Sequence, residues 1–164
     1  MITQTHRPKT FTEVSGQPIA IRTLKALVKN ADSSPRSIIL SGPYGVSKTT
    51  SARIFARAMN CDNLQKSDPC LDCDFYLQPI DQSSYYYEYD ASVVGGVDGI
   101  RQIREEAFLE ITGVRKVVVF DEFHLVTRAG QSALLKAIEE IPRSIWVFFA
   151  TPDTGVEMPM CCRA

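Results

Sequence analysis

The chain has 164 residues, a length that suits one domain with a sizeable hydrophobic core. Its hydrophobic content of 45% and its charged content of 23% are typical of globular proteins. The formal net charge of −1 gives no general electrostatic basis for nucleic-acid binding, so any such contact must come from a local patch or from partner subunits. No apolar run approaches the length of a membrane span, and residues 1–7 lack the apolar core of a secretion signal. We therefore expect a cytoplasmic protein that does not bind membranes.

Apolar runs alternate with helical patterns along the chain. Apolar residues recur at helical spacing in four places: Ile21, Leu24, Leu27 and Val28; Ile54, Phe55, Ala58 and Met59; Ile100, Ile103, Ala107 and Ile111; and Leu134, Leu135 and Ile138. The predicted strands cover residues 37–41, 85–90, 117–121 and 145–150. This alternation predicts an α/β fold in which helices flank both faces of a parallel sheet. Because such sheets bind ligands at the carboxyl ends of their strands, we expect the functional site there.

A glycine-bearing loop follows the first predicted strand and leads into a helix. It consists of Gly42, Pro43, Tyr44, Gly45, Val46, Ser47, Lys48, Thr49 and Thr50. Strand, loop and helix in this order form a phosphate cradle (a P-loop), because main-chain N–H groups and the helix dipole favour an anion. We expect Lys48 to reach the β- and γ-phosphates of a nucleotide and the Thr49 hydroxyl to bind Mg²⁺. Ser47 stands where the pattern has glycine, which places a Cβ near the phosphates and restricts the backbone.

The predicted strand 117–121 ends in two adjacent carboxylates, Asp121 and Glu122. In P-loop nucleotide hydrolases an Asp at this position holds the Mg²⁺. The Glu beside it is placed to polarise a water for attack on the γ-phosphate, which is a general-base role. Paired with the P-loop, this arrangement favours ATP hydrolysis over the alternative of a small-molecule kinase, whose acceptor is not water.

Cysteines gather in a loop-like insertion predicted over residues 60–84. The three in this insertion are Cys61, Cys70 and Cys73. The total of five, an odd number in a chain expected to be intracellular, argues against disulfides. Tetrahedral zinc needs four ligands, and the spacing places the fourth near Tyr76. Two alternatives remain: a zinc site completed by Asp72 or Asp74, and a reduced loop that carries three thiols.

Further short stretches accompany these motifs in a fixed order. They cover residues 6–11, 16–17, 89–92, 96–101, 121–124, 133–142, 150–151 and 162–163. Together with the P-loop and the cysteines, they resemble the ATPase subunits of the clamp loader of bacterial DNA polymerase III, the gamma/tau type, within the AAA+ superfamily. The resemblance runs nearly end to end. It departs from the family at Ser47, at Tyr76 in place of a fourth cysteine, and at Ala164 in place of the last residue of a Ser-Arg-Cys motif.

The resemblance implies an AAA+ nucleotide-binding domain over residues 1–164. In such a domain Arg7 and Pro8 lie on the adenine side of ATP, Thr151 reads the γ-phosphate, and Arg163 enters the ATP site of a neighbouring subunit. The implied partners are other clamp-loader subunits, a sliding clamp, and primed DNA reached through the assembled ring. The family continues into a helical lid and a collar domain that this chain does not include, so we expect a fragment or a truncated, phage-type relative. The alternative within this family is a non-hydrolysing assembly subunit, similar to delta-prime, that donates an arginine finger.

Overall fold

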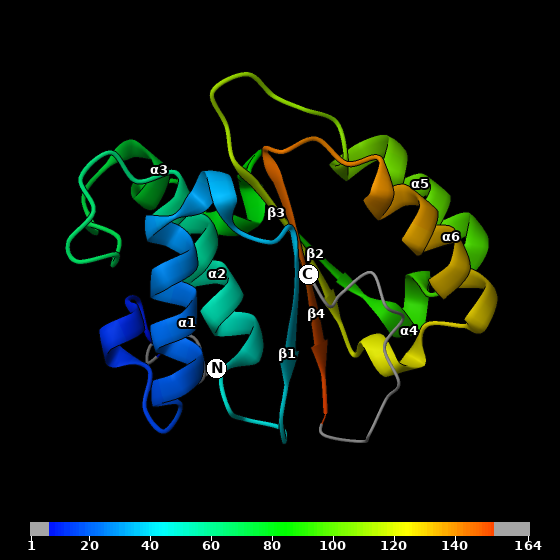
Figure 1. Ribbon diagram of the computed structural model, residues 1–164, viewed down its shortest axis with the longest axis horizontal. Helices are drawn as coiled ribbons and strands as arrows, with labels where there is room; N and C mark the ends of the chain where they lie inside the picture. Colours follow the sequence, from blue (N-terminus) through cyan, green and yellow to red (C-terminus); the bar gives the residue numbers. More distant parts are fainter. Residues whose placement is uncertain (1–6, 153–164) are drawn as a thin grey trace.

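A four-stranded parallel sheet lies at the centre of the computed structural model, which describes residues 7–152 (Figure 1). Its strands are β1 (Ser37–Ser41), β2 (Tyr86–Asp90), β3 (Lys116–Asp121) and β4 (Ile145–Thr151), in the spatial order β1-β4-β3-β2. The helices are α1 (Pro18–Lys29), α2 (Lys48–Met59), α3 (Asp74–Leu77), α4 (Ala91–Val94), α5 (Val97–Ala107) and α6 (Arg128–Glu139). Short 3-10 turns are η1 (Phe11–Glu13), η2 (Ala31–Ser33), η3 (Ile80–Gln82) and η4 (Phe123–Leu125). Within residues 7–152, no helix has both the length and the apolar character to cross a bilayer.

Helices cover both faces of the sheet, which confirms the predicted architecture. Helices α1 and α2 lie on one side, and α4, α5 and α6 lie on the other (Figure 1). The side chains of β3 alternate between the two cores because successive residues of a strand point to opposite faces. Val117 and Val119 join the core under α1 and α2, whereas Val118 and Phe120 join the core under α5 and α6.

Strand β4 is the most deeply buried strand, because β1 and β3 pair with it on either side. All seven of its residues are buried. Trp146 is 1% exposed, and its Nε1 donates a hydrogen bond to Ser34 Oγ at 3.0 Å. Its ring packs edge-on against Phe55 at 6.3 Å between centroids. These contacts fix the tryptophan rigidly at the amino end of β4.

The strand ends lie within one residue of the predictions, but two other features differ from them. Helix α5 ends at Ala107, so Ile111 lies outside it, although the apolar pattern extends to that residue. The chain turns there, since Gly113 has a φ of 77° and the Val114 N–H donates to the Ile111 carbonyl. The predicted loop 60–84 contains α3 and η3, two elements too short to show a helical period in the sequence.

Candidate nucleotide-binding site

The P-loop has the backbone conformation that its glycines permit. Gly42 has a φ of 149° and Gly45 a φ of 84°. The Gly42 N–H donates to the Thr151 carbonyl at 3.2 Å, which fixes the start of the loop to the end of β4. Helix α2 begins at Lys48, so its positive dipole end and its first N–H groups lie next to the loop. The loop and the helix terminus therefore form the cradle predicted from the sequence.

Ser47 adopts the left-handed conformation, with a φ of 64° and a ψ of 29°. This conformation costs an L-residue about 1–2 kcal/mol, because its Cβ approaches the following carbonyl oxygen, whereas glycine has no such cost. The Ser47 side chain makes no hydrogen bond to the first turn of α2 that could offset the strain. The structure thus gives a backbone reason for the glycine that the motif normally has here.

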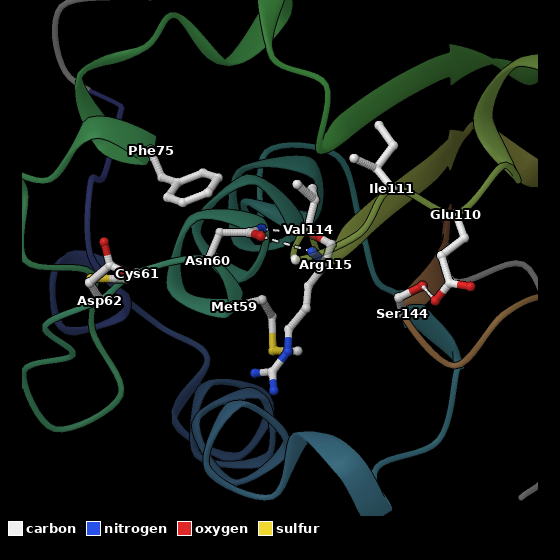
Figure 2. Close-up of a pocket in the computed structure, with 11 residues that line it drawn as sticks. Met59, Asn60, Cys61, Asp62, Phe75, Glu110, Ile111, Val114, Arg115 and Ser144 are labelled. Atoms are coloured by element: carbon white, nitrogen blue, oxygen red, sulfur yellow. Dashed lines mark hydrogen bonds between the residues drawn. The ribbon is translucent and has the colours of Figure 1, made fainter.

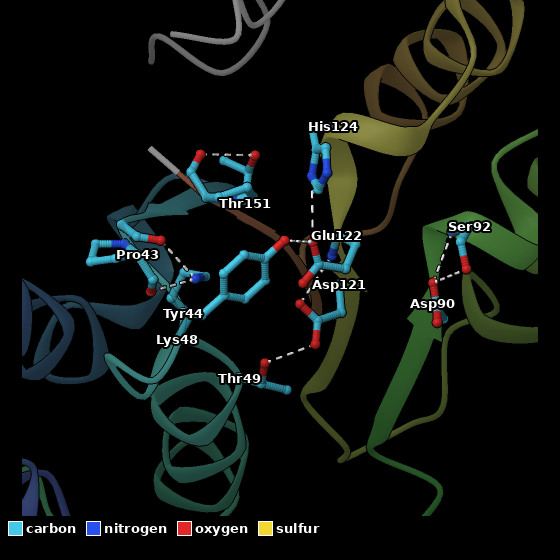
Figure 3. A network of polar contacts seen from close by, with 12 residues as sticks. Pro43, Tyr44, Lys48, Thr49, Asp90, Ser92, Asp121, Glu122, His124 and Thr151 are labelled. Carbon is cyan, nitrogen blue, oxygen red and sulfur yellow. Dashed lines mark hydrogen bonds and ion pairs between the residues drawn. The ribbon is translucent and has the colours of Figure 1, made fainter. Parts of the chain in front are cut away.

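The side chains of Lys48 and Thr49 point into the site from the first turn of α2 (Figure 3). Lys48 Nζ donates to the carbonyl oxygens of Gly42 at 2.8 Å and Pro43 at 3.0 Å, so its ammonium group lies against the loop. Thr49 Oγ1 lies 3.1 Å from Asp121 Oδ2, and a hydrogen bond joins them. Adjacent ligands of an octahedral Mg²⁺ are about 3 Å apart. The two oxygens are therefore close enough to share a magnesium ion.

Glu122 lies directly after β3 and receives two further polar contacts that the sequence did not indicate. Its carboxylate accepts a hydrogen bond from the hydroxyl of Tyr44 at 3.1 Å, so a P-loop side chain reaches across the site to the end of β3 (Figure 3). This hydrogen bond is the main reason why the pKa of Tyr44 is raised, so the phenol stays a neutral donor. His124 Nδ1 lies 3.5 Å from Glu122 Oε2, the oxygen that also accepts the Tyr44 hydrogen bond. The main-chain N–H of Glu122 donates to Asp121 Oδ1 at 3.0 Å, and these contacts together hold the two carboxylates at the end of β3.

The other predicted nucleotide-site residues are placed less directly. Thr151 is 3% exposed, and its hydroxyl donates to the Pro152 carbonyl at 3.3 Å. Arg7 and Pro8 line a cavity of about 340 Å³ together with Thr50 of α2. This cavity runs from Thr50 along α2 to Arg57 and is closed by Tyr76 and Asp81 of the insertion, so the predicted adenine-side residues lie along the side of α2. Arg163 lies outside the described residues.

Asp68, in the cysteine-bearing insertion, anchors the N-terminal segment that contains Phe11 and Thr12. Its carboxylate accepts hydrogen bonds from the Phe11 N–H at 2.7 Å, the Thr12 hydroxyl at 2.6 Å and Lys25 Nζ at 2.8 Å. Burial on its own would raise the pKa of Asp68, but these hydrogen bonds together lower it. No sequence motif indicates this contact, because the partners are separated by more than 40 residues.

The three predicted thiol ligands lie together. The Sγ atoms of Cys61, Cys70 and Cys73 all lie within 4.8 Å of one another, and the Cys70 N–H donates to Cys61 Sγ at 3.3 Å. Such a group fits three of the four positions around a tetrahedral zinc ion. The neighbouring Asp72 carboxylate accepts a hydrogen bond from the Cys70 thiol and raises the pKa of that thiol to about 12. Tyr76 packs its ring against the Arg57 guanidinium, 4.5 Å from the ring centroid.

A separate cavity of about 440 Å³ lies at the amino-terminal edge of the sheet (Figure 2). Asn60 closes one side by bonding the main chain of Arg115 in both directions, at 2.7 Å and 2.9 Å. Of the predicted site residues, the cavity includes Cys61 but none from the P-loop or from the end of β3. The P-loop and the acidic end of β3, where the sequence predicts nucleotide binding, lie at the opposite edge of the sheet.

A parallel sheet with a P-loop after β1 and paired carboxylates after β3 defines a P-loop nucleotide-binding fold of the AAA+ type. Solved structures agree with this class. The chain is similar to a RuvB variant from Thermotoga maritima, with a TM-score of 0.64 and 21% identity over 98% of this chain and 47% of that one. It is also similar to a DNA polymerase III gamma subunit-related protein from Thermotoga maritima, with a TM-score of 0.51 and 20% identity over 79% of this chain and 39% of that one. These likenesses show the fold.

Sequence comparison identifies the family. The family model described as "DNA polymerase III, delta subunit" matches residues 16–157, and the chain belongs to this family. The DNA polymerase III subunit gamma/tau of Mycobacterium tuberculosis is 38% identical over 158 residues, which cover 94% of this chain and 27% of that protein. The subunit tau of Bacillus subtilis is 36% identical over 150 residues, which cover 90% of this chain and 26% of that protein. The chain thus spans about a quarter of the length of these relatives.

Proposed function

We propose that this chain binds ATP with Mg²⁺ and hydrolyses it as a cytoplasmic motor subunit of a clamp loader, which opens a ring-shaped sliding clamp and loads it onto primed DNA. The observation that carries the proposal is the 3.1 Å contact between Thr49 and Asp121, with Glu122 next to it. This contact brings the P-loop and the acidic end of β3 together at one edge of the sheet. The kinship with gamma/tau subunits supports the replication role.

Each residue then has a defined task. Lys48 binds the β- and γ-phosphates through charge-assisted hydrogen bonds. Thr49 and Asp121 would hold the Mg²⁺, which when bound would supply positive charge against the charge on the transferring phosphoryl group. Glu122 orients the attacking water and accepts its proton, while the Tyr44 hydroxyl keeps its carboxylate at the end of β3.

The ring context completes the catalytic set in this proposal. Thr151 reads the γ-phosphate at the end of β4, and Arg163 enters the site of a neighbouring subunit, where an arginine finger stabilises transition-state charge. Mixing Glu122→Gln chains with Arg163→Ala chains in reconstituted clamp-loader rings tests this arrangement. Each variant alone should be nearly inactive, and the mixture should regain activity where an intact site meets an intact finger. No recovery, given proof that mixed rings form, would refute a finger supplied in trans.

A titration of labelled ATP with and without Mg²⁺ tests the binding step directly. The chain should bind ATP more tightly when Mg²⁺ is present. Lys48→Ala should abolish most of the binding, because it deletes a charged contact to the phosphates. Lys29→Ala, at the end of α1, removes the same charge outside the P-loop and serves as the control. Equal ATP affinity in the two variants would show that the P-loop is not the binding site.

A second candidate is a non-hydrolysing assembly subunit of the same complex. The strained Ser47 favours this candidate, because a subunit that does not hydrolyse ATP can tolerate a replacement of the motif glycine. The intact set of Lys48, Thr49, Asp121 and Glu122 favours the motor. Measuring ATP turnover in a reconstituted ring separates the two, since the assembly subunit would bind ATP without hydrolysing it.

We also propose that the three thiols hold zinc weakly, because only three thiolates are available in the cluster. Metal analysis of the purified chain should give less than one zinc per molecule, and Cys70→Ser should lower that content further. A full equivalent that resists a chelator would instead require a fourth strong ligand.

A further inference from the structure

A pocket lined by three arginines lies at the amino-terminal edge of the sheet, opposite the P-loop. Its volume is about 330 Å³, and it is lined by Asp32, Arg36, Arg115, Arg143, Ser144 and Trp146. These residues come together because β1, β4 and β3 are neighbours, so the segments that precede their first residues meet at one edge. We call it the arginine pocket. Arg115 and Ser144, labelled in Figure 2, also line the adjoining cavity of about 440 Å³.

The arginine pocket carries uncompensated positive charge. Three guanidinium groups line it with a single carboxylate, that of Asp32, and a second carboxylate, Glu110, lies at its edge, where it accepts a hydrogen bond from Ser144 Oγ at 2.9 Å. The Asp32 carboxylate is 99% exposed and lies 3.7 Å from Arg115, which makes it a weak, screened partner. The Arg143 side chain is exposed and makes no hydrogen bond or ion pair with the residues that the structure describes. Burial is the main reason why the pKa of Arg36 is lowered; Arg143 and Arg115 also lower it, and Asp32 opposes them.

Arg36 is held in place by neutral groups. Its guanidinium stacks 4.1 Å from the ring centroid of Trp146 and donates to the carbonyl oxygen of Ala31 at 2.9 Å. The tryptophan is itself fixed by its hydrogen bond to Ser34. Because none of these partners is charged, Arg36 keeps its full charge and its remaining N–H donors for a ligand. A guanidinium that is already in place loses little entropy when an anion binds.

We propose that the arginine pocket binds a phosphate monoester or free phosphate. Guanidinium groups match phosphate oxygens in geometry and charge. The three arginines outnumber the two nearby carboxylates, Asp32 and Glu110, so the pocket keeps a net positive charge. A phosphate monoester, which carries about −1.5 to −2 at pH 7, has oxygens enough to accept hydrogen bonds from more than one guanidinium. The phosphate can belong to a small molecule or to the 5′ end of a nucleic acid. This site is separate from the P-loop and does not depend on ATP hydrolysis.

Trp146 provides a local reporter, because it is the single tryptophan of the chain and lies under Arg36. Inorganic phosphate titrated into the 164-residue chain should change its fluorescence saturably, whereas chloride at the same ionic strength should not. Arg143→Gln should weaken the apparent affinity about tenfold or more, the loss expected for one charge-assisted hydrogen bond. Arg128→Gln, exposed at the start of α6, makes the same charge change outside the pocket and should leave the affinity unchanged.

Two oligonucleotides, one with a 5′-phosphate and one with a 5′-hydroxyl, identify the source of the phosphate. Binding of the phosphorylated form alone, lost in Arg143→Gln, assigns the site to nucleic-acid ends. Binding of inorganic phosphate but of neither oligonucleotide assigns it to small molecules. The proposal is overturned if phosphate gives no saturable signal, if Arg143→Gln binds phosphate as well as the parent, or if both oligonucleotides bind equally and inorganic phosphate does not.

Discussion

Replacing Ser47 by glycine should stabilise the protein, because the residue lies in the left-handed region with a φ of 64°. Removing the Cβ relieves about 1–2 kcal/mol of strain. Glycine also gives the unfolded chain more conformational entropy, which lowers the free energy of unfolding by about 0.4–1 kcal/mol. The net gain lies between about 0 and 1.6 kcal/mol, and its midpoint of about 0.8 kcal/mol corresponds to a rise in melting temperature of about 2–3 °C for a chain of this size.

The matched control is Ser47→Ala, which keeps the Cβ and removes only a hydroxyl that makes no capping hydrogen bond. Its melting temperature should not rise, and thermal unfolding of the three proteins side by side measures the difference. Ser47→Gly should also bind ATP more tightly, because it removes a Cβ next to the phosphates. A melting temperature no higher than that of Ser47→Ala would refute the strain argument. Weaker ATP binding in the glycine variant would show that Ser47 is an adapted part of this loop.

Two further outcomes can be checked with standard assays. Thr49→Val should bind ATP with an affinity that no longer responds to Mg²⁺. Thr49→Ser keeps the hydroxyl and should retain the response. An unchanged response in Thr49→Val would show that Thr49 is not a metal ligand. Asp68→Asn should lower the urea midpoint at neutral pH, because it breaks the ion pair with Lys25. Since the folded pKa of Asp68 is lowered, its stabilising effect is present above its ordinary pKa of about 4 and is lost as the pH falls through the folded value. The difference between parent and Asp68→Asn should therefore shrink in acid, and a difference that grows there would contradict this account.

The sequence determined the local parts of the site. The strand, the P-loop and the start of α2 follow one another without a break, so their order alone specifies the cradle. Asp121 ends a buried strand and Glu122 follows it, and the carboxyl ends of parallel strands share one edge. The meeting of Thr49 with Asp121 could therefore be predicted across 72 residues.

Only the tertiary structure decided the contacts that depend on strand order and on the path of the loops. The bond between Tyr44 and Glu122 and the anchoring of Phe11 by Asp68 join residues 78 and 57 positions apart, with no motif to link them. The arginine pocket exists because β4 lies between β1 and β3, an order that hydrophobic periodicity does not encode. The left-handed backbone of Ser47 was likewise visible only in the fold. Periodicity and motifs report the neighbours of a residue along the chain, whereas these features arise from neighbours in space.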